Sequence, residues 1–456
     1  MTESHSSESD DISNVQEPTP SQPEFREGGY GWVCVACTFL INAHTWGINA
    51  AYGVFLSYYL STDIFPGTTA LEYAFVGGLS ISCAMFIAPL ATFLSQRIST
   101  RFVLNLGTIL EAVSLITTSF VKTDWQLFLS QGICFGIGMG LCFCGSVGVA
   151  SYWFRRKRSL VNGIASAGSG IGGLVYSLAV GKMIPQMGFP WAMRVLGILA
   201  FVVNVVCANL MRIPSTTPTS PPSTTTKEIR EKEKEEKKAR NLPHLPPFLL
   251  NIDYHLLLGW AFLSGLGYVT LLFSMSAYSV AIGLTHSQGS LASALLNLGQ
   301  ALGRPAVGLV SDKAGRMRTA FAAALLSGIL PLVVWIFADG VGVTYFFAIA
   351  VGLFAGTFLA AAAPLVAEVV GIQQLGTALG LFWFVLGPPT AVAEAIAVQL
   401  RDEDGRSKPY LRVQLFVGSA AALFPTEDTP STSKSPFSAN MQRDRTTTVH
   451  HPELNV

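Results

Sequence analysis

The stretch RIPSTTPTSPPSTTTKEIREKEKEEKKARNLPHLPP (Arg212–Pro247) decides how this chain is organised, because it is the only long polar segment with apolar sequence of membrane-spanning length on both sides. Residues 214–226 are almost entirely Pro, Ser and Thr, and residues 227–240 are a dense run of both charge signs. Neither composition can build a packed core. We therefore predict a solvated linker, with a specific docking segment as the alternative.

The composition indicates a membrane protein. Of the 456 residues, 50% are hydrophobic and only 12% are charged. Most charged residues sit in short clusters between uncharged runs of about 20 residues, the length that crosses a bilayer core. A net charge of +1 gives no support for nucleic-acid binding. The 7 cysteines all lie in apolar runs and are predicted to be free thiols.

The apolar runs predict an all-α fold in two sets of six helices. The first set is expected near residues 32–58, 73–94, 102–121, 125–150, 160–181 and 191–211, and the second near 254–282, 288–310, 319–337, 342–370, 376–400 and 411–424. We therefore divide the chain into a disordered tail (1–27), a first helix bundle (28–212), the charged linker (213–247), a second bundle (248–424) and a second disordered tail (425–456).

The twelfth span, Leu411–Phe424, is too short. A helix of this length extends about 21 Å, whereas the hydrocarbon core is about 30 Å thick. Either the helix thins the bilayer locally, or the reading frame departs from the functional transcript near Phe424. We favour the frame departure, because a half-span leaves the second bundle open on one side.

Lys and Arg are concentrated in the connections after spans two, four, six and eight, and they are sparse in the others. Basic loops resist translocation, so the N-terminus and the linker are predicted to face the cytosol. A weak repeat supports two related halves: Pro89 is followed seven residues later by Gln96-Arg97, and Pro305 by Asp312-Lys313. Two six-helix units in parallel repeat are the plan of the major facilitator superfamily.

Three motifs carry a closer resemblance. REGGYGWVCV (residues 26–35), SYWFRRKRSLVNGIASAGSGIGG (residues 151–173) and GRPAVGLVSDKAGR (residues 303–316) are similar to signatures of the monocarboxylate porter family of that superfamily. The resemblance covers about residues 27–212 and 248–420, and the diverged linker and tails resemble fungal members. It implies a twelve-span secondary transporter of a small organic solute, proton-linked in many relatives.

Arg304 is the leading candidate for substrate binding, because an arginine inside an apolar run is costly unless it faces an aqueous cavity or a partner. Its guanidinium suits a carboxylate through two parallel hydrogen bonds. The resemblance implies an Asp-x-x-x-Arg-Pro pattern at this place, but Gln300 stands where the acidic residue is expected. Snorkelling of Arg304 to the membrane surface is the alternative.

Span one departs from the family in a second way. Ala50 stands where relatives that import monocarboxylates carry a lysine, which argues against lactate or pyruvate cotransport. Trp46, Asn49 and Tyr52 instead provide neutral hydrogen-bonding and aromatic groups suited to a larger organic solute. Hydrogen bonding between helices would explain these residues equally well.

Charged residues suggest two further roles. Glu111 lies near the centre of span three and is a candidate proton carrier, with a structural hydrogen bond as the alternative. Asp312, Arg316 and Arg318 follow span eight, where a charge network would hold one conformation closed, with a topological anchor as the alternative. A further carboxylate, Glu394, is expected at the membrane interface near the end of its span.

No phosphate-binding loop and no nucleophile–base pair stands out, so the sequence supports neither an ATP-driven pump nor an enzyme, and no cofactor or metal site is predicted. Three functions stay open: uptake of a small organic acid, export of a fungal-type metabolite, and nutrient sensing by a transporter-like receptor. The expected partners are a small organic solute, a proton as a candidate coupling ion, and the lipid bilayer. The plasma membrane is the expected location, with an internal membrane as the alternative.

Overall fold

The structure is a computed structural model that describes residues 28–62, 67–213, 247–401 and 408–422. Within these ranges every regular element is helical, which confirms the predicted all-α fold class. Both predicted tails and almost all of the predicted linker lie outside the described residues. The expected frame departure near Phe424 also lies outside them.

The first half of the chain contains spans one to six. Its elements are α1 (Gly31–His44), α2 (Trp46–Ala50), α3 (Tyr52–Thr62), α4 (Ala70–Phe86), α5 (Ala88–Arg97), α6 (Thr100–Thr118), α7 (Asp124–Leu127), the π-helix η1 (Phe128–Cys134), α8 (Phe135–Ser146), α9 (Val149–Trp153), α10 (Arg158–Met187) and α11 (Phe189–Leu210).

The second half contains the remaining spans. Its elements are η2 (Pro247–Leu250), α13 (Ile252–Ala281), α14 (His286–Ala314), α15 (Arg316–Val333), η3 (Trp335–Phe337), α16 (Val341–Phe354), α17 (Thr357–Val370), α18 (Leu375–Val385), α19 (Gly387–Gln399) and α20 (Leu411–Ala422). Span ten is thus broken into α16 and α17, and span eleven into α18 and α19.

Ten helical segments in the described chain are long and apolar enough to cross a membrane. The two other predicted spans are α14, which is as long as the others but more polar, and α20, which has 12 residues. Large apolar side chains such as Phe93, Leu178 and Val202 are exposed on the outside of the molecule, as expected for a surface that faces lipid.

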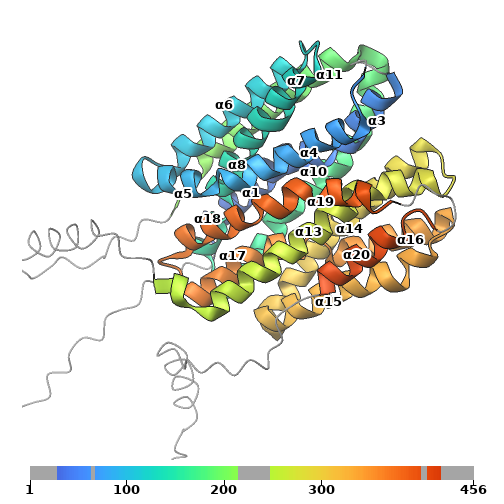
Figure 1. The fold of residues 1–456 in the computed structure, drawn as a ribbon. Helices are drawn as coiled ribbons and strands as arrows, with labels where there is room; N and C mark the ends of the chain where they lie inside the picture. The colour runs from blue at the N-terminus through green and yellow to red at the C-terminus, as the bar shows by residue number, and fades with distance from the viewer. Residues whose placement is uncertain (1–27, 63–66, 214–246, 402–407, 423–456) are drawn as a thin grey trace, which may run out of the picture.

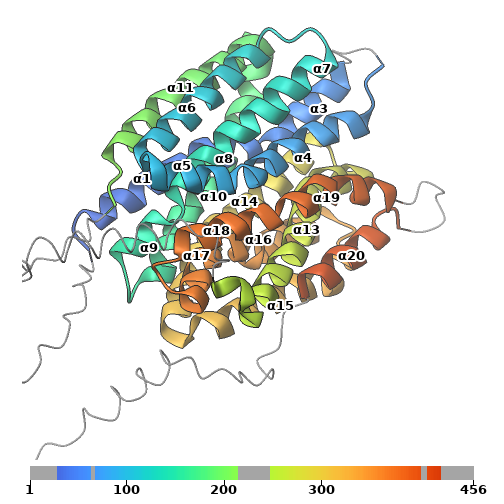
Figure 2. The same ribbon diagram turned by 60° about the vertical axis from the view of Figure 1, so that its left-hand side comes forward.

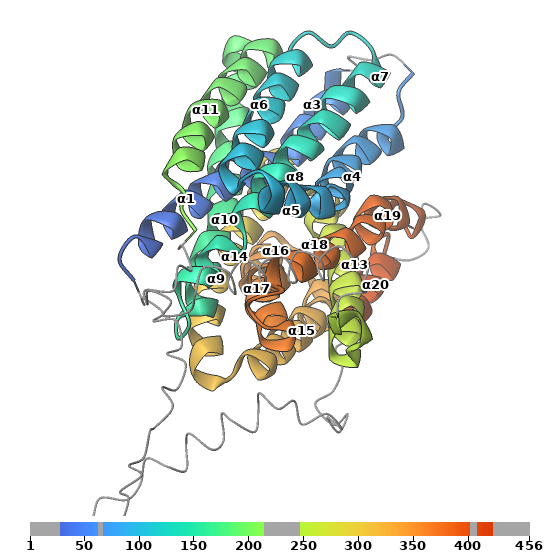
Figure 3. The ribbon, with the colours of Figure 1, turned by 90° about the vertical axis from the view of Figure 1, so that its left-hand side faces the viewer.

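The two halves form two helix bundles that lie side by side. The blue-to-green first half lies above the yellow-to-red second half in Figure 1, and the turned views in Figure 2 and Figure 3 show the same separation. Two helix pairs join the bundles most extensively, α10 with α14 and α4 with α19. The α10–α14 pair needs glycine: a Cβ at Gly163 would lie 2.4 Å from the Arg304 carbonyl oxygen.

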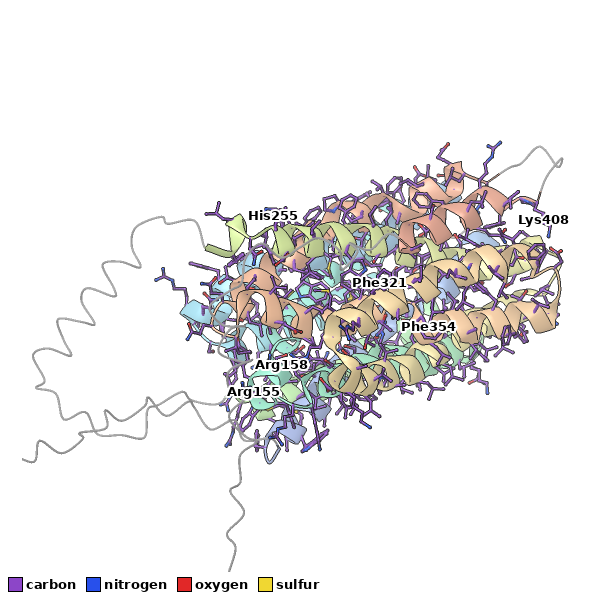
Figure 4. The ribbon with its side chains drawn as sticks, turned by 90° about the horizontal axis from the view of Figure 1, so that it is seen from below. Arg155, Arg158, His255, Phe321, Phe354 and Lys408 are labelled. Atoms are coloured by element: carbon purple, nitrogen blue, oxygen red, sulfur yellow. The ribbon has the colours of Figure 1, made fainter. Side chains whose placement is uncertain are left out.

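We name the two ends of the molecule by the linker. The linker end is where α11 ends and α13 begins, and the far end is opposite. Arg155, Arg158 and His255 lie at the linker end, and Lys408 lies at the far end (Figure 4).

Candidate functional site

A cavity lies between the two bundles at the middle of the molecule, with about 690 Å³ of space not filled by atoms, open solvent included. Both halves contribute to its wall: α1, α2, α4, α8 and α10 from the first, and α13, α14, α17 and α19 with the preceding Leu386 from the second. The residues that line it are Asn42, Trp46, Asn49, Ala50, Ile81, Met85, Phe143, Ser166, Ser169, Tyr268, Val269, Leu272, Asn297, Gln300, Arg304, Phe358, Leu359, Leu386 and Thr390.

Arg304 is held in the wall of this cavity and is only 2% exposed. Its Nη1 donates to the Ser166 carbonyl oxygen at 2.7 Å and to Ser169 Oγ, both on α10 of the opposite half. Its Nη2 donates to Gln300 Oε1 at 2.5 Å and to the Tyr268 hydroxyl at 3.4 Å. These partners are all neutral, and no carboxylate of the described chain lies within ion-pair distance of Arg304. The positive charge is therefore available to an anionic or strongly polar ligand.

The fully buried side-chain polar atoms of the wall that lack a hydrogen-bond partner are all donors. Trp46 Nε1, Asn297 Nδ2, Gln300 Nε2 and Arg304 Nε have no hydrogen-bond partner. The orientation of the Gln300 amide follows from its network, because Oε1 accepts from both Arg304 and Tyr268. Among the described lining residues, no buried side-chain acceptor is left unpaired. A ligand that supplies oxygen acceptors would therefore satisfy groups that the protein leaves unsatisfied.

Four of the five predicted binding residues line the cavity. Arg304, Gln300, Trp46 and Asn49 are brought together, although Asn49 Nδ2 is already occupied by Ser80 Oγ at 2.6 Å. Tyr52 lies outside the lining: it is buried, and its hydroxyl donates to the Tyr73 carbonyl oxygen at 2.5 Å. This contact favours hydrogen bonding between helices, the alternative that the sequence also allowed.

Sequence reasoning missed Asn297, Tyr268, Phe358 and Ser169. Asn297 could have been found, because it stands two helical turns before Arg304 and hence on the same face of α14. The others belong to α13, α17 and α10, and no local pattern indicates that these helices meet at one point.

The break in span ten packs directly against Arg304. Gly356 lies between α16 and α17 in a left-handed conformation with φ of 73°. A Cβ at this position would lie 2.9 Å from Arg304 Nη2. Only glycine fits here, because the backbone conformation and the close guanidinium both exclude a side chain. A broken helix thus forms part of the site, as in other transport folds.

A polar contact joins the halves at the linker end. Asp312 on α14 accepts hydrogen bonds from the backbone N–H groups of Ser159 (2.9 Å) and Leu160 (2.8 Å), in the first turn of α10. The residue preceding this turn, Lys157, makes no side-chain cap. Asp312 therefore caps a helix of the opposite half, where a negative charge is also favoured by the helix dipole.

Arg316 extends the same contact. It lies 3.8 Å from Asp312, donates to Ser159 Oγ at 3.3 Å and donates to the Arg155 carbonyl oxygen at 3.1 Å. Two members of the predicted charge network, Asp312 and Arg316, thus pair with each other and contact the first half, and the third, Arg318, is exposed on α15.

Gln96, which corresponds to Asp312 in the sequence repeat, makes the equivalent contact from the first half to the second. Gln96 on α5 donates to Thr377 Oγ1 at 3.3 Å, in the first turn of α18. The Thr92 hydroxyl points to the Gly376 carbonyl oxygen at 3.5 Å. The linker end is therefore closed by one charged contact and one neutral contact.

Glu111 lies away from the cavity. It is 0% exposed between α6 and neighbouring helices of the first half, and its Oε2 accepts from Asn204 Nδ2 on α11 at 3.0 Å. A Cβ at Gly138 of α8 would lie 2.6 Å from the Glu111 backbone nitrogen, so α8 packs closely against α6 at this residue. This arrangement favours the structural alternative.

Two bundles of membrane-spanning helices around a central cavity that contains a buried arginine define a multi-pass membrane transporter. Residues 34–393 match the Major Facilitator Superfamily, and the chain belongs to this superfamily. It is 33% identical over 397 residues to "Probable transporter MCH2" of Saccharomyces cerevisiae, covering 87% of this chain and 81% of that protein. It is 26% identical to the "Fujikurins efflux protein" of Gibberella fujikuroi, covering 87% and 82%.

A solved structure has the same fold. The human organic anion transporter MFSD10 superimposes with a TM-score of 0.63 and 15% sequence identity, over 86% of this chain and 97% of that one. At this identity the likeness concerns the fold alone.

Proposed function

We propose that this protein is a secondary active transporter that carries an oxygen-rich organic solute, with an anionic or strongly polar group, through the central cavity by alternating access. The observation that carries the proposal is the buried Arg304 guanidinium, which has only neutral partners and stands among unpaired donors. The aromatic and aliphatic remainder of the lining suits a solute with an apolar body.

Export of a metabolite is the second candidate. Two relatives in filamentous fungi carry the names of efflux proteins for fujikurins and agnestins, and the similarity extends over most of the chain. The resemblance to monocarboxylate porters supports a carboxylate-bearing solute. Ala50 and Gln300 both line the cavity in place of the charged residues of those porters, so we expect a substrate larger than lactate or pyruvate.

We further propose that the linker end faces the cytosol, from the distribution of Lys and Arg, and that the protein lies in the plasma membrane. The solute then passes between the far end and the linker end as the two bundles rock about the cavity. Opening of the linker end requires the contacts of Asp312 and Gln96 to break.

The experiment has two stages. Metabolite profiling of cells and medium, with and without the gene, identifies a compound whose distribution depends on the protein and gives the direction of transport. Transport of that compound is then measured for Arg304→Lys and Arg304→Ala in proteoliposomes. Arg304→Lys keeps the charge but loses the planar fork, so transport should fall at least tenfold.

Arg194→Lys is the matched control, because Arg194 is bound to Ser119 and to the faces of Phe120 and Trp191 inside the first half, away from the cavity. Normal transport by Arg304→Ala, at the same protein level, would refute the proposal.

A further inference from the structure

Glu394 on α19 is a buried carboxyl group that the proposed binding site does not use. It is 8% exposed rather than interfacial as its sequence position suggests, and its Oε2 has no hydrogen-bond partner. Burying a carboxylate without a partner costs several kcal/mol, whereas the protonated form costs far less. A movement that exposes Glu394 to water would therefore favour its ionised form.

Glu394 lies on the face of α19 that packs against α4 of the other half. One helical turn before it, Thr390 Oγ1 lies 3.5 Å from Ser82 Oγ, and a Cβ at Gly78 would lie 3.4 Å from the Ala391 carbonyl oxygen. Thr390 also lines the central cavity. Glu394 thus continues the inter-half contact from the cavity toward the far end.

The described groups around Glu394 form no ion pair with it. Three residues are near enough to Glu394 for an electrostatic interaction. They are Tyr52 of α3, Arg401 at the end of the span that contains Glu394, and Tyr410. Arg401 stacks over the Tyr410 ring at 4.9 Å and makes no ion pair with Glu394.

The helices packed on α19 add no countercharge. In α4 the one charged residue is Glu72, whose carboxylate is held by Thr69 in a capping box, and Tyr73 is the neighbouring titratable group. The part of α13 that contacts α19 offers the Thr270 hydroxyl, which donates to the Ala393 carbonyl oxygen at 3.1 Å, and contains no charged residue.

We propose that Glu394 is the proton-binding group that couples closure of the far end to pH. This proposal rests on the alternating access proposed above. When α4 and α19 separate, water reaches the carboxylate and it releases its proton. When they pack together, a proton moves from solvent hydronium to the carboxylate oxygen, and no other bond changes. Closure takes up a proton, so acid favours the closed far end and a rise in pH favours the open one.

Glu111 provides the contrast. It is also buried, but it is bonded to Asn204 inside one bundle, and rocking of rigid bundles leaves that pair intact. A carboxyl group whose surroundings do not change between two states cannot link them to pH. The proton linkage is therefore assigned to Glu394 and not to Glu111.

The test needs no substrate. Spin labels are attached through p-acetylphenylalanine at Phe120 and Phe337, two exposed phenylalanines at the far end of the first and second half. Distance distributions of the purified full-length protein in lipid nanodiscs are recorded from pH 5 to pH 8. The wild type should shift toward shorter distances in acid. Because one proton is taken up, the ratio of closed to open molecules should change by at most about tenfold per pH unit.

Glu394→Gln should hold the short distance at every pH, whereas Glu394→Asp and Glu111→Gln should both keep the pH response. Glu394→Asp also shows that a response lost in the glutamine variant is not a folding defect. A pH response that survives in Glu394→Gln, or one that is missing from the wild type, overturns the assignment. Because no substrate is present, neither result bears on Arg304 and the binding cavity.

Discussion

Replacement of Asp312 should loosen the linker end by a predictable amount. Asp312 is 8% exposed and accepts two backbone N–H groups at the start of α10, and hydrogen bonds to a charged group contribute about 1.5–3 kcal/mol each. Water replaces these bonds when the end opens, so the net effect is smaller. Asp312→Asn keeps one acceptor and loses the charge, which should shift the closed-to-open balance by about 1–2 kcal/mol, a factor of about 5–30.

The shift is measured as a distance distribution across the linker end, with spin labels at Phe102 and Ile252, which are exposed on the first and second half. Asp312→Asn should increase the population of long distances, and Asp312→Ala should increase it further, because alanine leaves both N–H groups of α10 uncapped. The ion pair with Arg316 adds little, since it is 3.8 Å long and partly exposed.

Lys313→Ala is the matched control, because Lys313 is the adjacent exposed charge at the end of the same helix. It should leave the distribution unchanged. If Asp312→Ala also leaves the distribution unchanged, the capping contact does not hold the linker end closed and the reasoning from its hydrogen bonds is wrong.

Two further predictions concern packing. Gly163→Ala should lower the thermal unfolding temperature in detergent, because its Cβ would meet the Arg304 carbonyl oxygen at 2.4 Å, whereas Gly181→Ala on the same helix meets nothing within 4 Å and should be neutral. Glu111→Leu should destabilise the first half by about 1–3 kcal/mol by leaving Asn204 unpaired, and adding Asn204→Leu should restore most of the loss. Equal stability of the single and double leucine variants in the same melts would show that this hydrogen bond is not the source of the effect.

The existence and order of the helices could be predicted from the sequence, because the length of an apolar run is a local property and the bilayer sets one length for all of them. In the part of the chain that the structure describes, ten segments are long and apolar enough to cross a membrane, in the predicted order. Arg304 was also recognisable, since an arginine within such a run always needs an explanation. The breaks in spans ten and eleven were not predicted, because they depend on close contacts such as that between Gly356 and Arg304.

Which polar groups meet was decided only by the tertiary structure. A helix buries one face or another according to its neighbours, and the sequence does not state that Ser169 and Tyr268 reach Arg304 from two other helices. The same reason separates the two buried carboxyl groups. Glu111 has the more central position along its span, but it is enclosed within one bundle, whereas Glu394 stands nearer the end of its span and is buried where the two bundles meet.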